Sequence, residues 1–124
     1  MAEAFIVGAV RSPMGRFRGG LSAFHPVDLG AQVLQGLFER VDVDPGAVDD
    51  VIWGCVGQIG AQAFNIGRNS WLAAGFPDSV PAVTLDRQCG SSQQAVHFAS
   101  QAVKAGDMDL VVAGGVEMLS LITL

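Results

Sequence analysis

Cys89 is the residue whose type and position are best suited to covalent chemistry. It falls between an apolar run that ends at Leu85 and a helical pattern that begins near Gly90. In open α/β sheets ligands bind beyond the carboxyl ends of strands, and a helix N-terminus offers unpaired N–H groups that stabilise a thiolate. Gly90 keeps this corner free of bulk, and Ser91 and Ser92 are expected to satisfy first-turn donors. We interpret Cys89 as a nucleophile that accepts an acyl group, with a buried, inert cysteine as the alternative.

The other reactive side chains do not form an obvious catalytic set with Cys89. His97 lies eight residues further on, about 12 Å along the helix axis, and is expected to be a partly buried helical residue. His25 precedes a helix and is interpreted as a surface or capping residue. Glu117 follows a strand, which is a plausible site position, but no second carboxylate accompanies it. Cys55 lies inside an apolar strand and fits a buried free thiol. The sequence therefore predicts a nucleophile without a local base.

Charge and cysteine content exclude several classes of function. The net charge is −5, which argues against nucleic-acid binding because that requires clustered Lys and Arg. Three of the seven basic residues (Arg11, Arg16 and Arg18) share one early loop. We interpret this loop as solvated, with a site for an anionic ligand as the alternative. Two cysteines this far apart are too few for a zinc site, so no metal is expected.

The hydrophobic content is high for a soluble chain of 124 residues. Half of the residues are apolar and 15% are charged, against about 25% charged in typical soluble domains. No apolar run approaches the ~18 residues of a membrane helix, so no membrane association is expected. The N-terminus lacks the basic region of a signal peptide, which favours a cytoplasmic protein with two free thiols. The apolar excess predicts that the chain needs a partner or more polypeptide to cover it.

Apolar patterning predicts an alternation of strands and helices. Compact apolar runs, typical of strands buried on both faces, occupy residues 5–10, 51–56, 80–85 and 109–113. Helical patterns with matching start and stop signals occupy residues 26–40, 65–74 and 90–105. This order predicts an α/β fold, with a mostly parallel sheet and helices on both faces.

Several motifs in the same order resemble the N-terminal part of a thiolase, the acyl-CoA:acetyl-CoA C-acyltransferase family. The resemblance covers nearly the whole chain. The similar segments are Arg11-Ser12-Pro13, Gly57-Gln58, Asn65-Ile66-Gly67-Arg68, Ala74-Gly75-Phe76-Pro77, Arg87-Gln88-Cys89-Gly90-Ser91 and Ala113-Gly114-Gly115-Val116-Glu117. The departures are Ser92, where the family often has glycine, and Met118-Leu119-Ser120, where the family usually has Ser-Met-Ser.

The resemblance implies a thiolase-like N-terminal half and a catalytic role for Cys89. In the family this cysteine attacks a 3-ketoacyl-CoA, releases acetyl-CoA and passes its acyl group to coenzyme A. Coenzyme A is thus a substrate, and no cofactor is bound permanently. The Arg-Gln before Cys89 favours the degradative direction, hence fatty-acid and lipid breakdown, without separating acyl-chain from sterol substrates. A homo-oligomer, dimer or tetramer, is also implied, with the strand at residues 80–85 at the dimer interface.

The resemblance also implies that residues 1–124 are only part of a thiolase. The family's histidine base, second cysteine, asparagine–histidine oxyanion pair and inserted CoA-binding region have no counterpart here, nor does its C-terminal half. We therefore expect this chain alone to be inactive. One alternative is a non-catalytic truncated remnant or dimerisation module. The other is a ketosynthase-like condensing enzyme of the same superfamily, against which the Gly-Gln loop and the Arg-Gln-Cys-Gly-Ser run argue.

Overall fold

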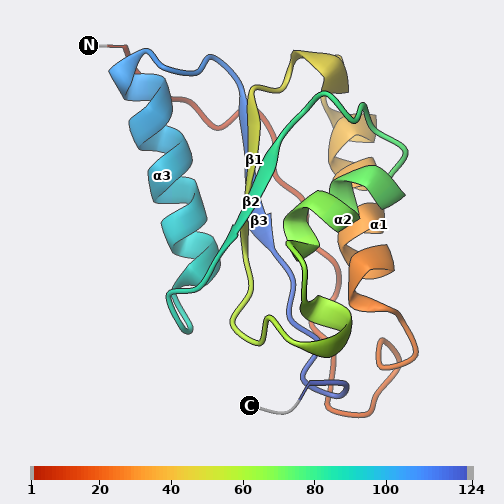
Figure 1. The fold of residues 1–124 in the computed structure, drawn as a ribbon. Helices are drawn as coiled ribbons and strands as arrows, with labels where there is room; N and C mark the ends of the chain where they lie inside the picture. Colours follow the sequence, from red (N-terminus) through yellow and green to blue (C-terminus); the bar gives the residue numbers. More distant parts are fainter. Residues whose placement is uncertain (1, 123–124) are drawn as a thin grey trace.

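The fold is a three-stranded parallel sheet with helices on both faces (Figure 1). A computed structural model describes residues 2–122. Along the chain the elements are α1 (Pro26–Arg40), β1 (Asp50–Gly54), α2 (Ile66–Ala73), β2 (Ala82–Leu85), α3 (Ser91–Ala105) and β3 (Val111–Gly115). Short 3₁₀ turns at Pro45–Ala47 and Gly60–Gln62 lie in the connections on either side of β1. The α/β class and the parallel pairing predicted from sequence are confirmed.

Local capping groups set the bounds of the helices. Pro26 stands in the first turn of α1, and the Nδ1 atom of His25 accepts a hydrogen bond from the Val27 N–H at 3.2 Å. The capping role expected of His25 is thereby confirmed. Asn65 caps α2 through its side-chain oxygen, and α3 ends at Gly106, which adopts a φ of 81°. Pro26 and Gly106 were predicted from the sequence because such signals lie within one turn of the helix they delimit, whereas Asn65 was expected inside its helix and is the residue that caps it.

The central strand β1 separates two hydrophobic clusters. Helices α1 and α2 cover one face of the sheet, and α3 covers the other (Figure 1). On the α1–α2 side the rings of Phe38, Trp71 and Phe76 pack edge-on or tilted, with centroids 4.8–5.8 Å apart. On the α3 side Ile52 packs against Ala95 and Ala99. Burial on both faces explains why the sequence of β1 is apolar without alternation.

The sheet order is β2–β1–β3, so β1 is the only strand with two neighbours among residues 2–122. Val51 is opposite Ala82 in β2 and Val112 in β3. Pro81 directly precedes β2, which is an edge strand, as expected for a proline at that position.

The strand expected at residues 5–10 is the one wrong prediction about the sheet. Residues 2–10 carry no regular secondary structure, and no strand of the described chain pairs with them. Phe5 and Ile6 are 77% and 81% exposed, so the expected burial on both faces is also absent. An apolar run of this length gains strand structure only from a neighbour that shares its backbone hydrogen bonds. Residues 5–10 share no such bonds with any strand among residues 2–122. Among the described residues, no helix is long and apolar enough to cross a membrane.

The start of α3 approaches the carboxyl ends of β1 and β3 without intervening side chains. A Cβ atom at Gly54 would lie 2.5 Å from the Ser92 backbone nitrogen and 2.6 Å from the Ser91 carbonyl carbon. A Cβ atom at Gly115 would overlap the Ser92 hydroxyl oxygen. Glycine at both positions therefore fixes how closely the first turn of α3 packs on the sheet.

We predict that Gly54→Ala lowers the free energy of unfolding by about 1–3 kcal/mol, because the obstructing atoms are mainly backbone. Gly36→Ala is the matched control. Gly36 lies inside α1 with open space where its Cβ would be, so this change should stabilise the chain by roughly 0.5–1 kcal/mol. Urea denaturation followed by circular dichroism measures both variants. Equal effects of the two substitutions would contradict the packing argument.

Candidate active site

The carboxyl ends of the three parallel strands bring together most of the reactive side chains. Cys89 follows β2, Cys55 follows β1 and Glu117 follows β3. Because the strands are parallel, these ends lie at the same edge of the sheet. The close contacts of Gly54 and Gly115 with α3 place the helix start at this edge as well.

The corner that carries Cys89 is held by a small hydrogen-bond network. The Ser91 hydroxyl accepts a bond from the Arg87 N–H at 2.9 Å and donates one to the Gln88 carbonyl at 2.6 Å. The Asp86 carboxylate accepts a bond from the Gln88 N–H at 2.7 Å. Gln88 adopts a φ of 47°, in the left-handed region, so the turn before Cys89 is tight and strained. These bonds fix the backbone that presents the sulfur.

Cys89 itself is exposed, with an open helix start beside it. The thiol is free and accessible, which contradicts the alternative of a buried cysteine. The cap residue of α3 is Gly90, and no side chain caps the helix. The expectation that Ser91 and Ser92 satisfy first-turn donors is wrong, because the Ser91 hydroxyl bonds to the turn before the helix instead. Within residues 2–122, the Cys89 backbone N–H donates to no other group.

Glu117 ties the end of β3 to the loop that follows β1. Its carboxylate accepts hydrogen bonds from the N–H groups of Val56 at 2.8 Å and Gly57 at 3.1 Å. It accepts a third from the side-chain amide of Gln62 at 3.3 Å. Burial by itself would raise the pKa of Glu117, but these donors outweigh it and leave the pKa below its usual value. Glu117 is therefore ionised at neutral pH and holds the loop.

Gln62 is the centre of this network, and sequence reasoning missed it. Its side chain is 0% exposed. The amide nitrogen donates to the Gly57 carbonyl at 2.9 Å as well as to Glu117, and the amide oxygen accepts from the Met118 N–H at 2.7 Å. The loop that carries Gln62 is rich in glycine and alanine and also contains Gln58, so nothing local marks Gln62 for such a role. Its partners at residues 117 and 118 are too distant in sequence to reveal it.

Cys55 is buried and unsuited to nucleophilic chemistry, as predicted. Burial raises the pKa of its thiol to about 12, and the neighbouring Glu117 carboxylate adds to the effect. The Gln62 amide lies 3.5 Å from the sulfur. The thiolate is the reactive form of cysteine, so the buried, protonated thiol of Cys55 is unreactive. Cys89, by contrast, is accessible to solvent.

The remaining candidates from the sequence lie outside this network. His97 is exposed on α3, so the expected partial burial is wrong. The reason is that Ala95 and Ala99 face the sheet and His97, between them on the helix, faces away. Arg11, Arg16 and Arg18 are exposed, which agrees with a solvated loop. Among the described residues no cluster of His, Cys, Asp and Glu could hold a metal ion.

The Glu117 network predicts a pH-dependent contribution to stability. Because the pKa of Glu117 is lowered on folding, its contribution is present above the unfolded-state pKa and is lost as the pH falls through the folded-state pKa. We predict that Glu117→Gln lowers the free energy of unfolding at pH 7 by about 1–3 kcal/mol, and that the loss shrinks at acidic pH. Glu39→Gln, at an exposed position, should change it by less than about 0.5 kcal/mol. Urea titrations at neutral and acidic pH measure both variants, and a pH-independent loss would contradict the assignment.

Comparisons with known proteins identify the family of the chain. The family model of the thiolase N-terminal domain matches residues 4–124. The chain is 58% identical over 122 residues to the steroid 3-ketoacyl-CoA thiolase FadA6 of Mycobacterium tuberculosis, covering 98% of this chain and 30% of that protein. It is 50% identical over 121 residues to a beta-ketoadipyl-CoA thiolase of Acinetobacter baylyi, with 97% and 30% covered. A 3-ketoacyl-CoA thiolase of Aliivibrio salmonicida is 47% identical, with 94% and 31% covered. The chain thus spans about 30% of the length of these relatives, and it belongs to the thiolase family.

Proposed function

We propose that this chain supplies the acyl-accepting nucleophile of a thiolase reaction, and that the nucleophile is Cys89. The observation that carries the proposal is the exposed sulfur of Cys89 at the uncapped start of α3. The relatives named above as thiolases support the reaction type. The other thiol of the chain, that of Cys55, is buried and held protonated.

The proposed reaction proceeds in two steps through an acylated cysteine. The Cys89 thiolate attacks the keto carbonyl of a 3-ketoacyl-CoA, and the bond between the keto carbon and the α carbon breaks. Its electron pair passes to the α carbon of the leaving acetyl-CoA, which takes a proton from a general acid. The thiolate of a second coenzyme A then attacks the acyl group, forms a new thioester and releases the Cys89 thiolate. Coenzyme A enters only as a substrate.

The described residues supply the nucleophile and one oxyanion donor, the Cys89 N–H. They place no base beside Cys89, since His25 caps α1 and His97 points away from the sheet. General acid–base catalysis contributes ~10²–10⁴-fold, and one oxyanion donor contributes ~10²–10³-fold. We therefore propose that residues 1–124 act as part of a thiolase and that this chain alone has negligible turnover.

A homo-oligomer accompanies this proposal, and β2 is the surface we assign to it. The strand lies at one edge of the sheet, and Val83 in it is a large apolar residue that is half exposed. The same exposed strand is what favours a non-catalytic dimerisation module as the second candidate. The two candidates differ in whether Cys89 carries an acyl group.

A chimera tests the proposed function. Residues 1–124 replace the matched region of the Mycobacterium tuberculosis relative, and thiolytic cleavage of a 3-ketoacyl-CoA by coenzyme A is assayed. We expect turnover that falls at least about 10³-fold in Cys89→Ser, because the nucleophile is lost. Cys55→Ser should retain most of the turnover. Activity of the chimera that survives Cys89→Ser would refute the assignment and favour the dimerisation module.

Alkylation of the unmodified chain gives a second readout that does not depend on how the chimera folds. Iodoacetamide at pH 8 should modify Cys89 and leave Cys55 unmodified, as located by peptide mass spectrometry. The physical reason is that Cys89 is exposed whereas the pKa of Cys55 is about 12. Equal labelling of both cysteines under native conditions would contradict the geometry of the site.

A further inference from the structure

Ser91 connects the turn that carries Cys89 to the sheet. It is the first residue of α3 and is only 5% exposed. Its Cβ atom and carbonyl carbon lie 2.9 Å and 2.6 Å from the position that a Cβ atom of Gly54 would take, so Ser91 rests on the backbone of β1. Close packing against a strand backbone leaves a side chain little freedom to move. The Ser91 hydroxyl is therefore held in a fixed place beside the turn.

The Gln88 carbonyl is the group that this hydroxyl holds. It accepts a hydrogen bond from the Ser91 hydroxyl at 2.6 Å and a second from the Ser91 N–H at 3.1 Å. The Gln88 carbonyl and the Cys89 N–H belong to one peptide unit, which is trans. Because a trans peptide unit is planar, its C=O and N–H bonds point in opposite directions. The two bonds from Ser91 therefore set the direction of the Cys89 N–H.

Two further hydrogen bonds keep this peptide unit from rotating. The Ser91 hydroxyl also accepts from the Arg87 N–H at 2.9 Å, and the Asp86 carboxylate accepts from the Gln88 N–H at 2.7 Å. Gln88 has a φ of 47°, in a region that only a few per cent of non-glycine residues occupy. Such a conformation persists only where its surroundings hold it. Asp86 is exposed, so the buried side chain that holds the turn is that of Ser91.

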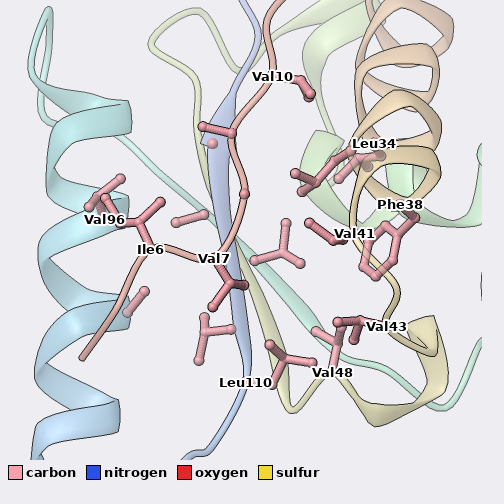
Figure 2. Close-up of a pocket in the computed structure, with 18 of the residues that line it drawn as sticks. Ile6, Val7, Val10, Leu34, Phe38, Val41, Val43, Val48, Val96 and Leu110 are labelled. Atoms are coloured by element: carbon pink, nitrogen blue, oxygen red, sulfur yellow. The ribbon is translucent and has the colours of Figure 1, made fainter. Parts of the chain in front are cut away.

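The apolar pocket of about 630 Å³ beside β3 is separate from this arrangement (Figure 2). Its lining comprises residues 3–12, parts of α1 and α3, and β3, and includes neither Ser91 nor Cys89. On α3 the lining begins at Val96 and includes Ser100. Ser100 lies about 13 Å from Ser91 along the helix axis, which is too far to touch the turn. It therefore offers a matched control hydroxyl on the same helix.

We propose that Ser91 is a positioning residue for acyl transfer, and that its hydroxyl orients the Cys89 N–H toward the oxyanion of the reaction. The inference rests on the function proposed for Cys89. When the thiolate adds to a carbonyl carbon, the electron pair of the C=O bond moves to the oxygen, and a fixed backbone N–H stabilises that charge. A misplacement of about 1 Å can lower a rate by ~10²-fold. Loss of the Ser91 hydroxyl should therefore slow the addition step.

Two reagents, applied to the unmodified chain, separate the direction of the N–H from the exposure of the sulfur. With iodoacetamide the Cys89 thiolate forms a C–S bond and iodide leaves, so no oxyanion forms. With p-nitrophenyl acetate the thiolate adds to the ester carbonyl, an oxyanion forms, and p-nitrophenolate leaves S-acetylated Cys89. Peptide mass spectrometry measures both rate constants at Cys89. Their ratio, acetylation over alkylation, cancels the thiolate fraction, which both reactions share.

We expect Ser91→Ala to lower this ratio by at least about threefold, because the oxyanion loses a correctly directed donor. The rate of alkylation alone should change by less than about twofold, since that reaction needs only an accessible thiolate. Ser91→Thr keeps the hydroxyl and should retain the ratio of the parent chain. Ser100→Ala should leave the ratio unchanged. Protection of buried Cys55 from iodoacetamide reports that each variant is folded.

The chimera with the Mycobacterium tuberculosis relative gives the same comparison under turnover. Ser91→Ala should lower kcat for the cleavage of a 3-ketoacyl-CoA by about tenfold or more and change KM little. The reason is that the oxyanion exists in the transition state and not in the bound substrate. Ser100→Ala should change neither constant.

Three results would overturn the inference. The first is an unchanged ratio in Ser91→Ala. The second is an equal fall of both rate constants, which would mean that Ser91 only supports the fold. The third is an equal fall of the ratio in Ser91→Thr, which would assign the effect to packing against Gly54. Turnover of the chimera that survives Cys89→Ser refutes the proposed function, whereas turnover that needs Cys89 but not the Ser91 hydroxyl refutes this inference alone.

Discussion

The site depends on how closely the first turn of α3 approaches the sheet. Gly54 and Gly115 lie at the carboxyl ends of adjacent strands, and Ser91 and Ser92 pack directly on their backbones. Contact between backbones yields less readily than contact with a flexible side chain. The sheet therefore fixes the helix start, and with it the direction of the free Cys89 N–H. The geometry around Cys89 is therefore determined by β1 and β3 more than by its own turn.

A second set of contacts links the carboxyl end of β3 to the loop after β1. Glu117 at the end of β3 binds two backbone N–H groups of the loop after β1, and buried Gln62 shares this carboxylate. The carboxylate also affects the two thiols unequally. It helps to raise the pKa of buried Cys55, whereas Cys89 stands outside this network and exposed to solvent. One carboxylate thus holds the loop after β1 and helps to keep the Cys55 thiol protonated.

The parts of the fold that could be predicted from sequence are those with local causes. Pro26 and Asn65 at helix starts, and Gly106 at a helix end, act within one turn, and the predicted helices agree with the structure. The corner position of Cys89 follows from the order of strand and helix alone. The partners of Glu117 lie about 60 residues away in sequence, and no periodicity signals them. The prediction of a strand at residues 5–10 fails for the opposite reason. The local pattern is that of a strand, but a strand also needs a paired neighbour, and these residues pair with no strand among residues 2–122.

The apolar excess of the sequence has a location in the structure. The exposed residues Phe5, Ile6 and Val7 line the same pocket as β3 and parts of α1 and α3. Among residues 2–122 the edge of β3 away from β1 has no paired strand. Glu117 lies two residues after β3 and accepts hydrogen bonds from the loop after β1. One strand therefore carries both the apolar surface at its free edge and the carboxylate that holds the loop of the candidate site, so the packing of β3 sets the position of that carboxylate.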